Sequence, residues 1–260
     1  MIKNKRHEEI IEILKNEGFA SVSNLCERLY ASPATIRRDL EYLEREGVVQ
    51  RNHGGAMLAG EKINIPVSFR QKKHYHEKMK IAELAATLIE RDSMIFTDAS
   101  TTVLCLAEKI AETEGVSVVT NGLPMSQSFI KSGINVFSTG GKLNESALAL
   151  VGNIAERTVA LFNADIMFFS TSSFDEAGQI SDYSELETSL RIAMLQRSRK
   201  KVYMFDSSKY SSRSAFCVCY AKDIDHIVTN VCFSEGQLEK MNFFLDRAIG
   251  GAYLYSKKYN

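Results

Sequence analysis

Two neighbouring arginines near the start of a predicted helix are the side chains of this sequence best suited to contact a nucleic acid. Arg37 and Arg38 stand within the run 31–47, among small and hydroxyl-bearing residues. An arginine pairs two donors with guanine in the major groove or holds a phosphate, and hydroxyl groups reach phosphate oxygens. The run therefore predicts DNA contacts from five residues, Ser32, Ala34, Thr35, Arg37 and Arg38.

The helix that must present these residues is defined by its cap and by its apolar face. Ser32 is a good N-cap, and Pro33 fits the first helical position. Ile36, Leu40 and Leu43 recur at i, i+4 and i+7, so one face is buried. The arginines and small residues of the first turns then point toward solvent.

A helix-turn-helix followed by a β-wing is the architecture that this pattern favours. A first helix is expected over about 3–16, and a short second helix begins at Ser23 or Asn24. The third helix would lie in the major groove with its N-terminal end at the base edges. A short strand and a Gly-Gly turn at 54–55 follow it. The wing would carry two further DNA contacts, Arg51 and His53.

The charge balance gives no global argument for a nucleic acid. The 260 residues include 32 Lys+Arg and 32 Asp+Glu, and residues 1–56 hold nine basic and nine acidic side chains. The prediction of DNA binding therefore depends on the local placement of the arginines. The alternative is a plain three-helix subdomain with a solvated arginine pair.

From Ile81 onward, apolar strand-like runs alternate with helical patterns, which predicts an α/β domain with a mostly parallel sheet covered by helices. Strands are expected at 94–97, 116–120, 135–138, 166–170, 201–205 and 226–229. Helices are expected at 79–90, 102–112, 124–131, 152–161, 184–198 and 235–247. The chain thus divides into an N-terminal domain at 1–57, a polar, basic linker at 58–76 and a larger domain at 77–260.

Six motifs resemble the DeoR family of bacterial transcription regulators. The N-terminal domain holds Ser-Pro-Ala-Thr-Ile-Arg-Arg-Asp-Leu-Glu-Tyr-Leu-Glu at 32–44 and Arg-Asn-His-Gly-Gly-Ala at 51–56. The larger domain holds Asp-Ala-Ser-Thr-Thr at 98–102, Thr-Asn at 120–121, Gly-Gly at 140–141 and Asp-Ser-Ser-Lys at 206–209. The resemblance covers nearly the whole chain.

The resemblance implies a winged helix-turn-helix that binds a double-stranded DNA operator and a sensor domain related to sugar-phosphate isomerase folds. Members of the family usually bind a phosphorylated sugar or polyol as effector and commonly repress operons of sugar metabolism. They act on DNA as homo-oligomers, so a dimer or tetramer is expected, in keeping with paired half-sites.

The matched motifs of the larger domain follow predicted strands, and ligands of open α/β sheets bind at that edge. Hydroxyls and helix amides after Asp98 suit a phosphate, paired glycines permit close approach, and Lys209 supplies a cation. The expected effector-binding residues are Asp98, Ser100, Thr101, Thr102, Asn121, Gly140, Gly141, Arg191 and Lys209. The alternative is that these loops only cap helices.

Four positions depart from the family pattern. Ser100 stands where the loop usually carries glycine, and the run 170–173 holds serines at both glycine positions of Gly-x-x-Gly. Arg191, four residues after Glu187, replaces the usual lysine and keeps the charge without lysine chemistry. These changes predict a reshaped pocket, an altered effector or no effector.

Other functional classes find little support. The five scattered cysteines indicate reduced thiols, and neither a signal peptide nor an apolar run of about 20 residues occurs, so a cytoplasmic protein without a membrane partner is expected. His74-x-His76 lacks further ligands, so no metal and no cofactor are expected.

The leading hypothesis is a DNA-binding repressor of a carbohydrate operon controlled by a phosphorylated effector, and not an enzyme. A regulator without a small-molecule effector is one alternative. A sugar-phosphate isomerase-like enzyme is the other: Asp98, Glu185 and Glu187 are possible bases, but no convincing acid–base constellation accompanies them.

Overall fold

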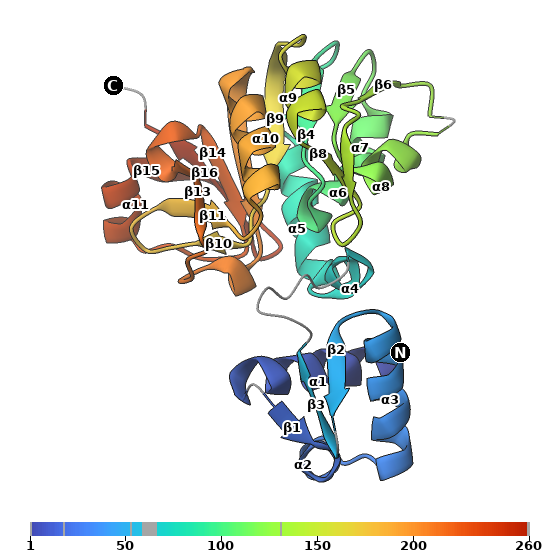
Figure 1. The fold of residues 1–260 in the computed structure, drawn as a ribbon. Coiled ribbons are helices and arrows are strands. Elements are labelled where there is room, and N and C mark those ends of the chain that lie inside the picture. Colours follow the sequence, from blue (N-terminus) through green and yellow to red (C-terminus); the bar gives the residue numbers. More distant parts are fainter. Residues whose placement is uncertain (1, 18, 53, 59–66, 131, 259–260) are drawn as a thin grey trace. The chain divides into compact units, whose positions relative to one another are not determined.

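The chain forms two compact units, Met1–Lys73 and His74–Asn260, in a computed structural model. The structure describes residues 2–17, 19–52, 54–58, 67–130 and 132–258. Figure 1 shows the elements of each unit along the chain. No helix within these ranges is long and apolar enough to cross a bilayer.

The first unit packs three helices against a small antiparallel sheet. The helices are α1 (Ile2–Glu17), α2 (Val22–Leu29) and α3 (Pro33–Arg45), followed by α4 (Val67–Lys72) within the stretch expected as linker. The strands β1 (Phe19–Ser21), β2 (Val49–Asn52) and β3 (Gly55–Leu58) pair in the order β1-β3-β2. Ile36, Leu40 and Leu43 of α3 lie in the core with Leu14 and Leu25, as their spacing predicts.

Two details of this unit differ from expectation. Ser21 caps α2 by accepting a hydrogen bond from the Asn24 amide at 3.1 Å, so neither Ser23 nor Asn24 is the cap. The third strand, β1, was not expected because three residues are too few to show a period in the sequence. Its pairing with β3 ties the chain between the first two helices to the β2–β3 hairpin.

The second unit is an eight-stranded, mostly parallel sheet with helices on both faces (Figure 1). Its order is β15-β16-β14-β12-β9-β4-β5-β6. The strands are β4 (Met94–Thr97), β5 (Ser117–Thr120), β6 (Asn135–Ser138), β9 (Ala164–Phe169), β12 (Ser198–Phe205), β14 (His226–Thr229), β15 (Phe243–Ile249) and β16 (Ala252–Lys257). Only two pairings within it are antiparallel, that of β16 with β14 and that of β16 with β15, so the fold is the expected α/β class.

Alternation along the buried strands divides the core into two layers. Ile95 of β4 packs with one helix set, and its neighbour Phe96 packs with the other. The first set is α5 (Tyr75–Ala86), α6 (Thr101–Leu104), α7 (Ala107–Glu112) and α8 (Leu123–Ser128). The second set is α9 (Asn153–Val159), α10 (Glu185–Gln196) and α11 (Glu235–Met241).

Two smaller sheets complete the unit. One joins β10 (Ser173–Phe174), β11 (Gln179–Asp182) and β13 (Phe216–Tyr220), and the other joins β7 (Lys142–Asn144) and β8 (Ala149–Val151). None of these short strands was expected, because their apolar runs are brief or half exposed. Of these strands, β11 brings Asp182 to Arg191 at the carboxyl edge of the large sheet.

The prediction of a single helix over 235–247 is wrong in its second half. Asn242 adopts a left-handed conformation with φ 63° and ends α11, and the following run forms β15. Pairing with β16 along most of its length overrides the helical spacing of its apolar residues. The helix expected over 102–112 is likewise interrupted, forming α6 and α7 with a break at Cys105 and Leu106.

Candidate functional site

The start of α3 presents the arginine pair as the sequence predicts. Ser32 accepts a hydrogen bond from the Thr35 amide at 3.2 Å, and the two hydroxyl oxygens lie 2.9 Å apart. Ala34, Arg37 and Arg38 are exposed. The hydroxyl groups of Ser32 and Thr35 therefore hold the first turn of the helix. The exposed side chains of Ala34, Arg37 and Arg38 remain available to a partner.

A concavity of about 560 Å³ links this helix to the β2–β3 hairpin. Its lining comes from α2, α3 and the hairpin: Val22, Ser23, Cys26, Glu27, Pro33, Arg37, Arg51, Gly54 and Gly55. The structure thus brings Arg37 and Arg51 to one surface. The Arg51 guanidinium lies 3.7 Å from the Glu44 carboxylate, which also accepts a hydrogen bond from the Arg51 amide at 3.1 Å. His53, the other expected wing contact, lies outside the described residues.

The β2–β3 hairpin needs a glycine at position 55, because a Cβ has no room there. A Cβ there would stand 2.4 Å from the Ala20 carbonyl oxygen and within 3 Å of the Phe19 ring. Only a residue without a side chain lets β3 pair this closely with β1. The wing is therefore fixed to the body of the unit.

A buried ion-pair cluster joins α1 to α3 and was missed by sequence reasoning. Asp39 accepts hydrogen bonds from the Arg6 guanidinium, one of them at 3.2 Å, and His7 Nε2 lies 3.1 Å from the same carboxylate. Burial alone raises the pKa of Asp39, but its contacts with Arg6 and His7 outweigh burial and hold this pKa below the ordinary value. The cluster fixes how α3 sits on α1, and hence which face presents Arg37 and Arg38.

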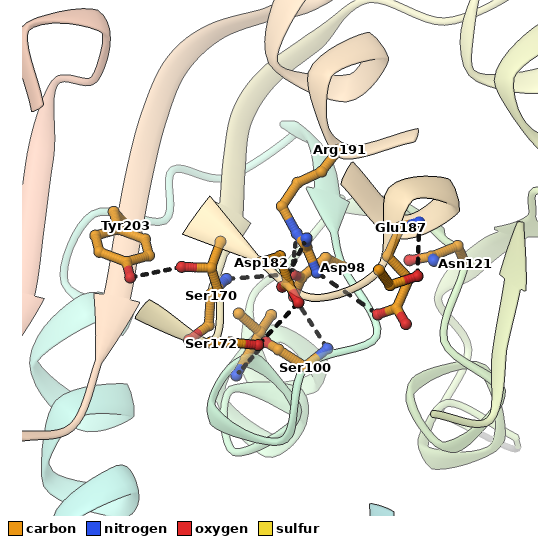
Figure 2. Close-up of polar contacts among 12 residues, drawn as sticks. Asp98, Ser100, Asn121, Ser170, Ser172, Asp182, Glu187, Arg191 and Tyr203 are labelled. Atoms are coloured by element: carbon orange, nitrogen blue, oxygen red, sulfur yellow. Dashed lines mark hydrogen bonds and ion pairs between the residues drawn. The ribbon is translucent and has the colours of Figure 1, made fainter. Parts of the chain in front are cut away.

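Arg191 is the centre of a second polar cluster, at the carboxyl edge of the large sheet (Figure 2). Its guanidinium lies 2.9 Å from Asp98, 3.1 Å from Asp182 and 3.8 Å from Glu187, and its side chain is 4% exposed. Burial lowers the pKa of Arg191, but the charges of these three carboxylates raise it above its ordinary value. Three carboxylates around one guanidinium leave a formal excess of two negative charges.

Asp98 holds the loop after β4 in place. Its carboxylate accepts hydrogen bonds from the Ser100 amide at 3.1 Å and the Ser170 amide at 3.2 Å, besides Arg191. Ser100 in turn accepts a hydrogen bond from the Val103 amide at 3.3 Å and so caps α6. Ser100 and Ser170, two of the three serines at family glycine positions, therefore take part in this network, Ser170 through its backbone amide.

The Asp182 carboxylate extends the network toward the β10–β11 hairpin. It accepts hydrogen bonds from the Ser172 hydroxyl at 2.8 Å and from the Tyr183 amide. The Thr171 hydroxyl lies 2.8 Å from the hydroxyl of Tyr203, whose burial raises the pKa of that phenol. Asp182 carries no sequence signal by itself, because it reaches Arg191 only through the fold of β11.

Thr101 and Thr102 are buried, and Thr101 contacts Lys78, which is not among the effector-binding residues expected from the sequence. The Lys78 ammonium donates a hydrogen bond to Thr101 Oγ1 at 3.1 Å, and Lys78 is 3% exposed. Lys78 lies on α5, the first helix of the second unit. A positive charge is therefore placed at the loop that the sequence predicts to bind an effector.

Three buried side-chain oxygens around this edge have no hydrogen-bond partner within the described part of the chain. They are Oγ1 of Thr97, Oδ1 of Asn121 and Oγ1 of Thr188. Thr97 pairs with Thr120 in the sheet, so Asp98 and Asn121 follow from adjacent strand ends. The Asn121 amide group is held by the Leu150 carbonyl, to which its nitrogen donates at 3.2 Å. Buried polar oxygens are usually hydrogen-bonded, so these three are candidates to bind a water molecule or a ligand.

The remaining residues of the expected effector site are Gly140, Gly141 and Lys209. Gly141 has φ 110°, and a Cβ there would lie 2.6 Å from the Val151 carbonyl, so packing accounts for this glycine. Gly140 also has a positive φ, of 64°. Lys209 ends a short 3-10 helix after β12, and its amide donates to the Asp206 carbonyl. Within the described ranges, no group of three or more His, Cys, Asp or Glu is arranged to hold a metal.

Two family models match the two parts of the chain. The DeoR-like helix-turn-helix domain matches residues 6–62, and the DeoR C-terminal sensor domain matches residues 73–231. The second match alone spans more than half of the 260 residues.

Curated relatives are similar over most of their length. An uncharacterized HTH-type transcriptional regulator of Bacillus subtilis is 33% identical, covering 88% of this chain and 90% of the relative. The glycerol-3-phosphate regulon repressor of Escherichia coli is 28% identical, covering 88% and 92%. Among solved structures, ribose 5-phosphate isomerase A of Neisseria gonorrhoeae shares 16% identity over 70% of this chain and 76% of that chain, with a TM-score of 0.38. The chain therefore belongs to the DeoR family of transcription regulators.

Proposed function

We propose that this protein is a DNA-binding repressor of a carbohydrate operon whose affinity for its operator is controlled by a phosphorylated sugar or polyol. The observation that carries the proposal is the shared surface of Arg37 and Arg51, which joins the start of α3 to the hairpin. A helix N-terminus with exposed arginines enters the major groove, and an adjoining hairpin contacts the flanking backbone. Similarity to the glycerol-3-phosphate regulon repressor of Escherichia coli also supports a role as a repressor.

The DNA-contacting residues that we propose are Ser32, Ala34, Thr35, Arg37, Arg38, Arg51 and His53. Arg37 and Arg38 are exposed on the first turns of α3 and are suited to read base edges. Ser32 and Thr35 act mainly by holding the helix start. A homo-oligomer would place two such helices on paired half-sites, and the protein would work in the cytoplasm without catalysing a reaction.

The effector site that we propose lies at the carboxyl edge of the large sheet, at Asp98, Ser100, Thr101, Thr102, Asn121, Gly140, Gly141, Arg191 and Lys209. The unpaired oxygens of Thr97 and Asn121 support a polar ligand there. An effector acts by binding the DNA-competent and DNA-incompetent arrangements with different affinity.

Footprinting on the upstream DNA of neighbouring operons tests the DNA-binding part. We expect a protected site whose affinity falls with salt, and a loss of about 5–150-fold for each of Arg37→Ala and Arg38→Ala. Arg45→Ala, at the exposed far end of the same helix, is the matched control and keeps full affinity. Absence of a salt-sensitive, sequence-preferring site would refute the proposal.

A panel of phosphorylated sugars and polyols, added to the preformed DNA complex, tests control by an effector. Release by one compound, and no release by its dephosphorylated form, is the expected result. A regulator without a small-molecule effector is the second candidate, because Arg191 is committed to three carboxylates. A complex that no compound in the panel releases would favour that candidate.

A further inference from the structure

We propose that β15 is the surface through which two copies of this chain associate, each β15 pairing edge to edge with the other about a two-fold axis. The inference rests on the homo-oligomer of the proposed function and names its interface. β15 forms one edge of the eight-stranded sheet, and it lies beyond residue 231, where the match to the sensor-domain model ends. An edge strand presents a row of backbone donors and acceptors that a second chain can bind.

The edge strand exposes apolar side chains along its length. Residues 244–249 are all exposed, and Phe244, Leu245 and Ile249 are 43%, 48% and 57% exposed. Exposed large apolar side chains that follow one another on a single element are typical of an interaction surface, whereas isolated ones are common on any protein. The strand therefore combines an open edge with an apolar surface.

The sequence of β15 is complementary to itself when two copies run antiparallel. With the axis between Asp246 and Arg247, the Asp246 of one copy faces the Arg247 of the other. Moving outward from the axis, Leu245 faces Ala248, and Phe244 faces Ile249. Each pair joins opposite charges or two apolar side chains, and cross-strand pairs of both kinds stabilise a sheet. A second copy of this chain is therefore the partner that the strand fits.

A β-bulge in β15 makes this register possible. Residues five positions apart lie on opposite faces of a regular strand, so they could not form a cross-strand pair. The pairing of β15 with β16 skips Asp246, which is the additional residue of the bulge. Phe244 and Ile249 consequently pair with Ser256 and Ala252, which are four positions apart. Phe244 and Ile249 therefore share one face of the sheet.

The inner apolar pair obeys the same rule. Leu245 and Ala248 pair with Tyr255 and Tyr253 of β16, which are two positions apart, so they share the other face. A bulge often protects an edge strand from pairing by disturbing its outer hydrogen bonds. Here the bulge lies at the proposed axis, so both copies interrupt their pairing at the same place and the two ends of the strand remain in register.

The charged pair has one member held in place and the other open to a partner. The Ser256 hydroxyl donates a hydrogen bond to Oδ2 of Asp246 at 2.7 Å, which orients the carboxylate and leaves Oδ1 available. Arg247 is exposed and has no ion-pair partner within the described residues. Exposed ion pairs contribute little free energy, so this pair would fix the register while the apolar pairs supply most of the stability.

Sedimentation equilibrium of the full chain, without DNA, tests the association. We expect a dimer at micromolar concentration, and Ile249→Lys should raise its dissociation constant by at least about tenfold, because a lysine then faces Phe244 at both ends of the interface. Ile130→Lys changes another exposed isoleucine, outside β15, and should leave the dimer intact. A wild-type chain that is monomeric throughout the micromolar range, or a dimer unaffected by Ile249→Lys, would overturn the proposal.

A charge swap tests the register. Arg247→Asp sets two carboxylates against each other in both charged pairs and should weaken the dimer, as should Asp246→Arg, which sets two guanidinium groups together. The double variant Asp246→Arg/Arg247→Asp restores opposite charges and should recover much of the loss. Equal weakening in the single and double variants would contradict the register, and circular dichroism checks that each variant is folded.

Cysteines introduced in place of Leu245 and Ala248 test the same register covalently. Directly opposite Cα atoms of antiparallel strands lie about 4.5–5.5 Å apart, which suits a disulfide. The oxidised double variant Leu245→Cys/Ala248→Cys should give a covalent dimer. Neither single variant should, because its new thiols are offset by three residues, or about 10 Å along the strand. The unmodified chain, with its five cysteines, is the control, and equal cross-linking in a single variant would contradict the register.

These measurements separate the inference from the proposed function. They use neither DNA nor an effector, so a dimer that is insensitive to changes in β15 refutes only the inference. Absence of a sequence-preferring site in footprinting would refute the proposed function and would leave the result on dimerisation unchanged.

Discussion

Replacing Arg191 by methionine should strongly destabilise the second unit. The substitution keeps most of the side-chain volume but leaves Asp98, Asp182 and Glu187 together without their shared counter-charge. Breaking a buried ion pair by removing one partner typically costs about 3–5 kcal/mol, and the loss of a cation shared by three carboxylates places this variant toward the upper end. Arg191→Lys keeps the charge but loses the guanidinium geometry, so a smaller loss of about 1–3 kcal/mol is expected.

Urea denaturation of the full chain, followed by circular dichroism and by tyrosine fluorescence, measures both losses. The midpoint of the second unit should fall by at least about 1 M in Arg191→Met. The double variant Asp98→Asn/Arg191→Met should recover part of the loss, because it removes one of the stranded charges. A loss below about 1 kcal/mol in Arg191→Met, or equal losses in the methionine and lysine variants, would refute the assignment of Arg191 as the charge that holds this edge together.

Three further predictions concern the first unit. Arg51→Ala should weaken specific and nonspecific DNA binding alike and reduce the slope of log affinity against log salt by about 1, measured by titration at several salt concentrations. Gly55→Ala should cost about 1–3 kcal/mol in denaturant unfolding, because the new Cβ meets the Ala20 carbonyl. Asp39→Asn should destabilise the unit at pH 7, and the deficit should shrink as the pH falls below about 4. The folded-state pKa of Asp39 lies below its unfolded value, so its contribution is present above the unfolded pKa of about 3.9 and is lost as the pH falls through the folded value.

An unchanged salt slope in Arg51→Ala would remove the hairpin from the DNA contact. Gly236→Ala is the control for Gly55, because nothing lies within 4 Å of the place that its added methyl group would take, and it should be neutral or slightly stabilising. A deficit in Asp39→Asn that stays constant down to about pH 3 would mean that the carboxylate charge does not contribute to the contact between α1 and α3.

The elements that sequence reasoning predicted correctly are those whose signals are local. Ser32 and Pro33 set the start of α3 within one turn, and Ile36, Leu40 and Leu43 identify its buried face. The sheet strands with continuous apolar runs, such as β4 and β14, were found at their observed bounds. In these cases the cap, the period and the burial all depend on residues a few positions apart.

The parts that were missed depend on distant contacts. The run 243–249 has apolar residues at helical spacing, and only its pairing with β16 makes it a strand. Arg191 was assigned to the effector site, but its partner Asp182 stands at the end of a short strand that no period predicts. The burial of Lys78 was not foreseen, because a lysine usually lies on a solvated face; it follows from the packing of α5 under the loop at Thr101.

The hydrogen bond between Asp98 and Arg191 joins residues 93 positions apart, whereas the contact of Arg6 with Asp39 spans 33. Chain closure over long separations is slow, and domains fold from the N-terminus as the chain is synthesised. We therefore expect the DNA-binding unit of a newly made chain to fold before the polar cluster of the second unit can form. On the proposed function, each newly made copy would be able to bind its operator before it is able to bind an effector.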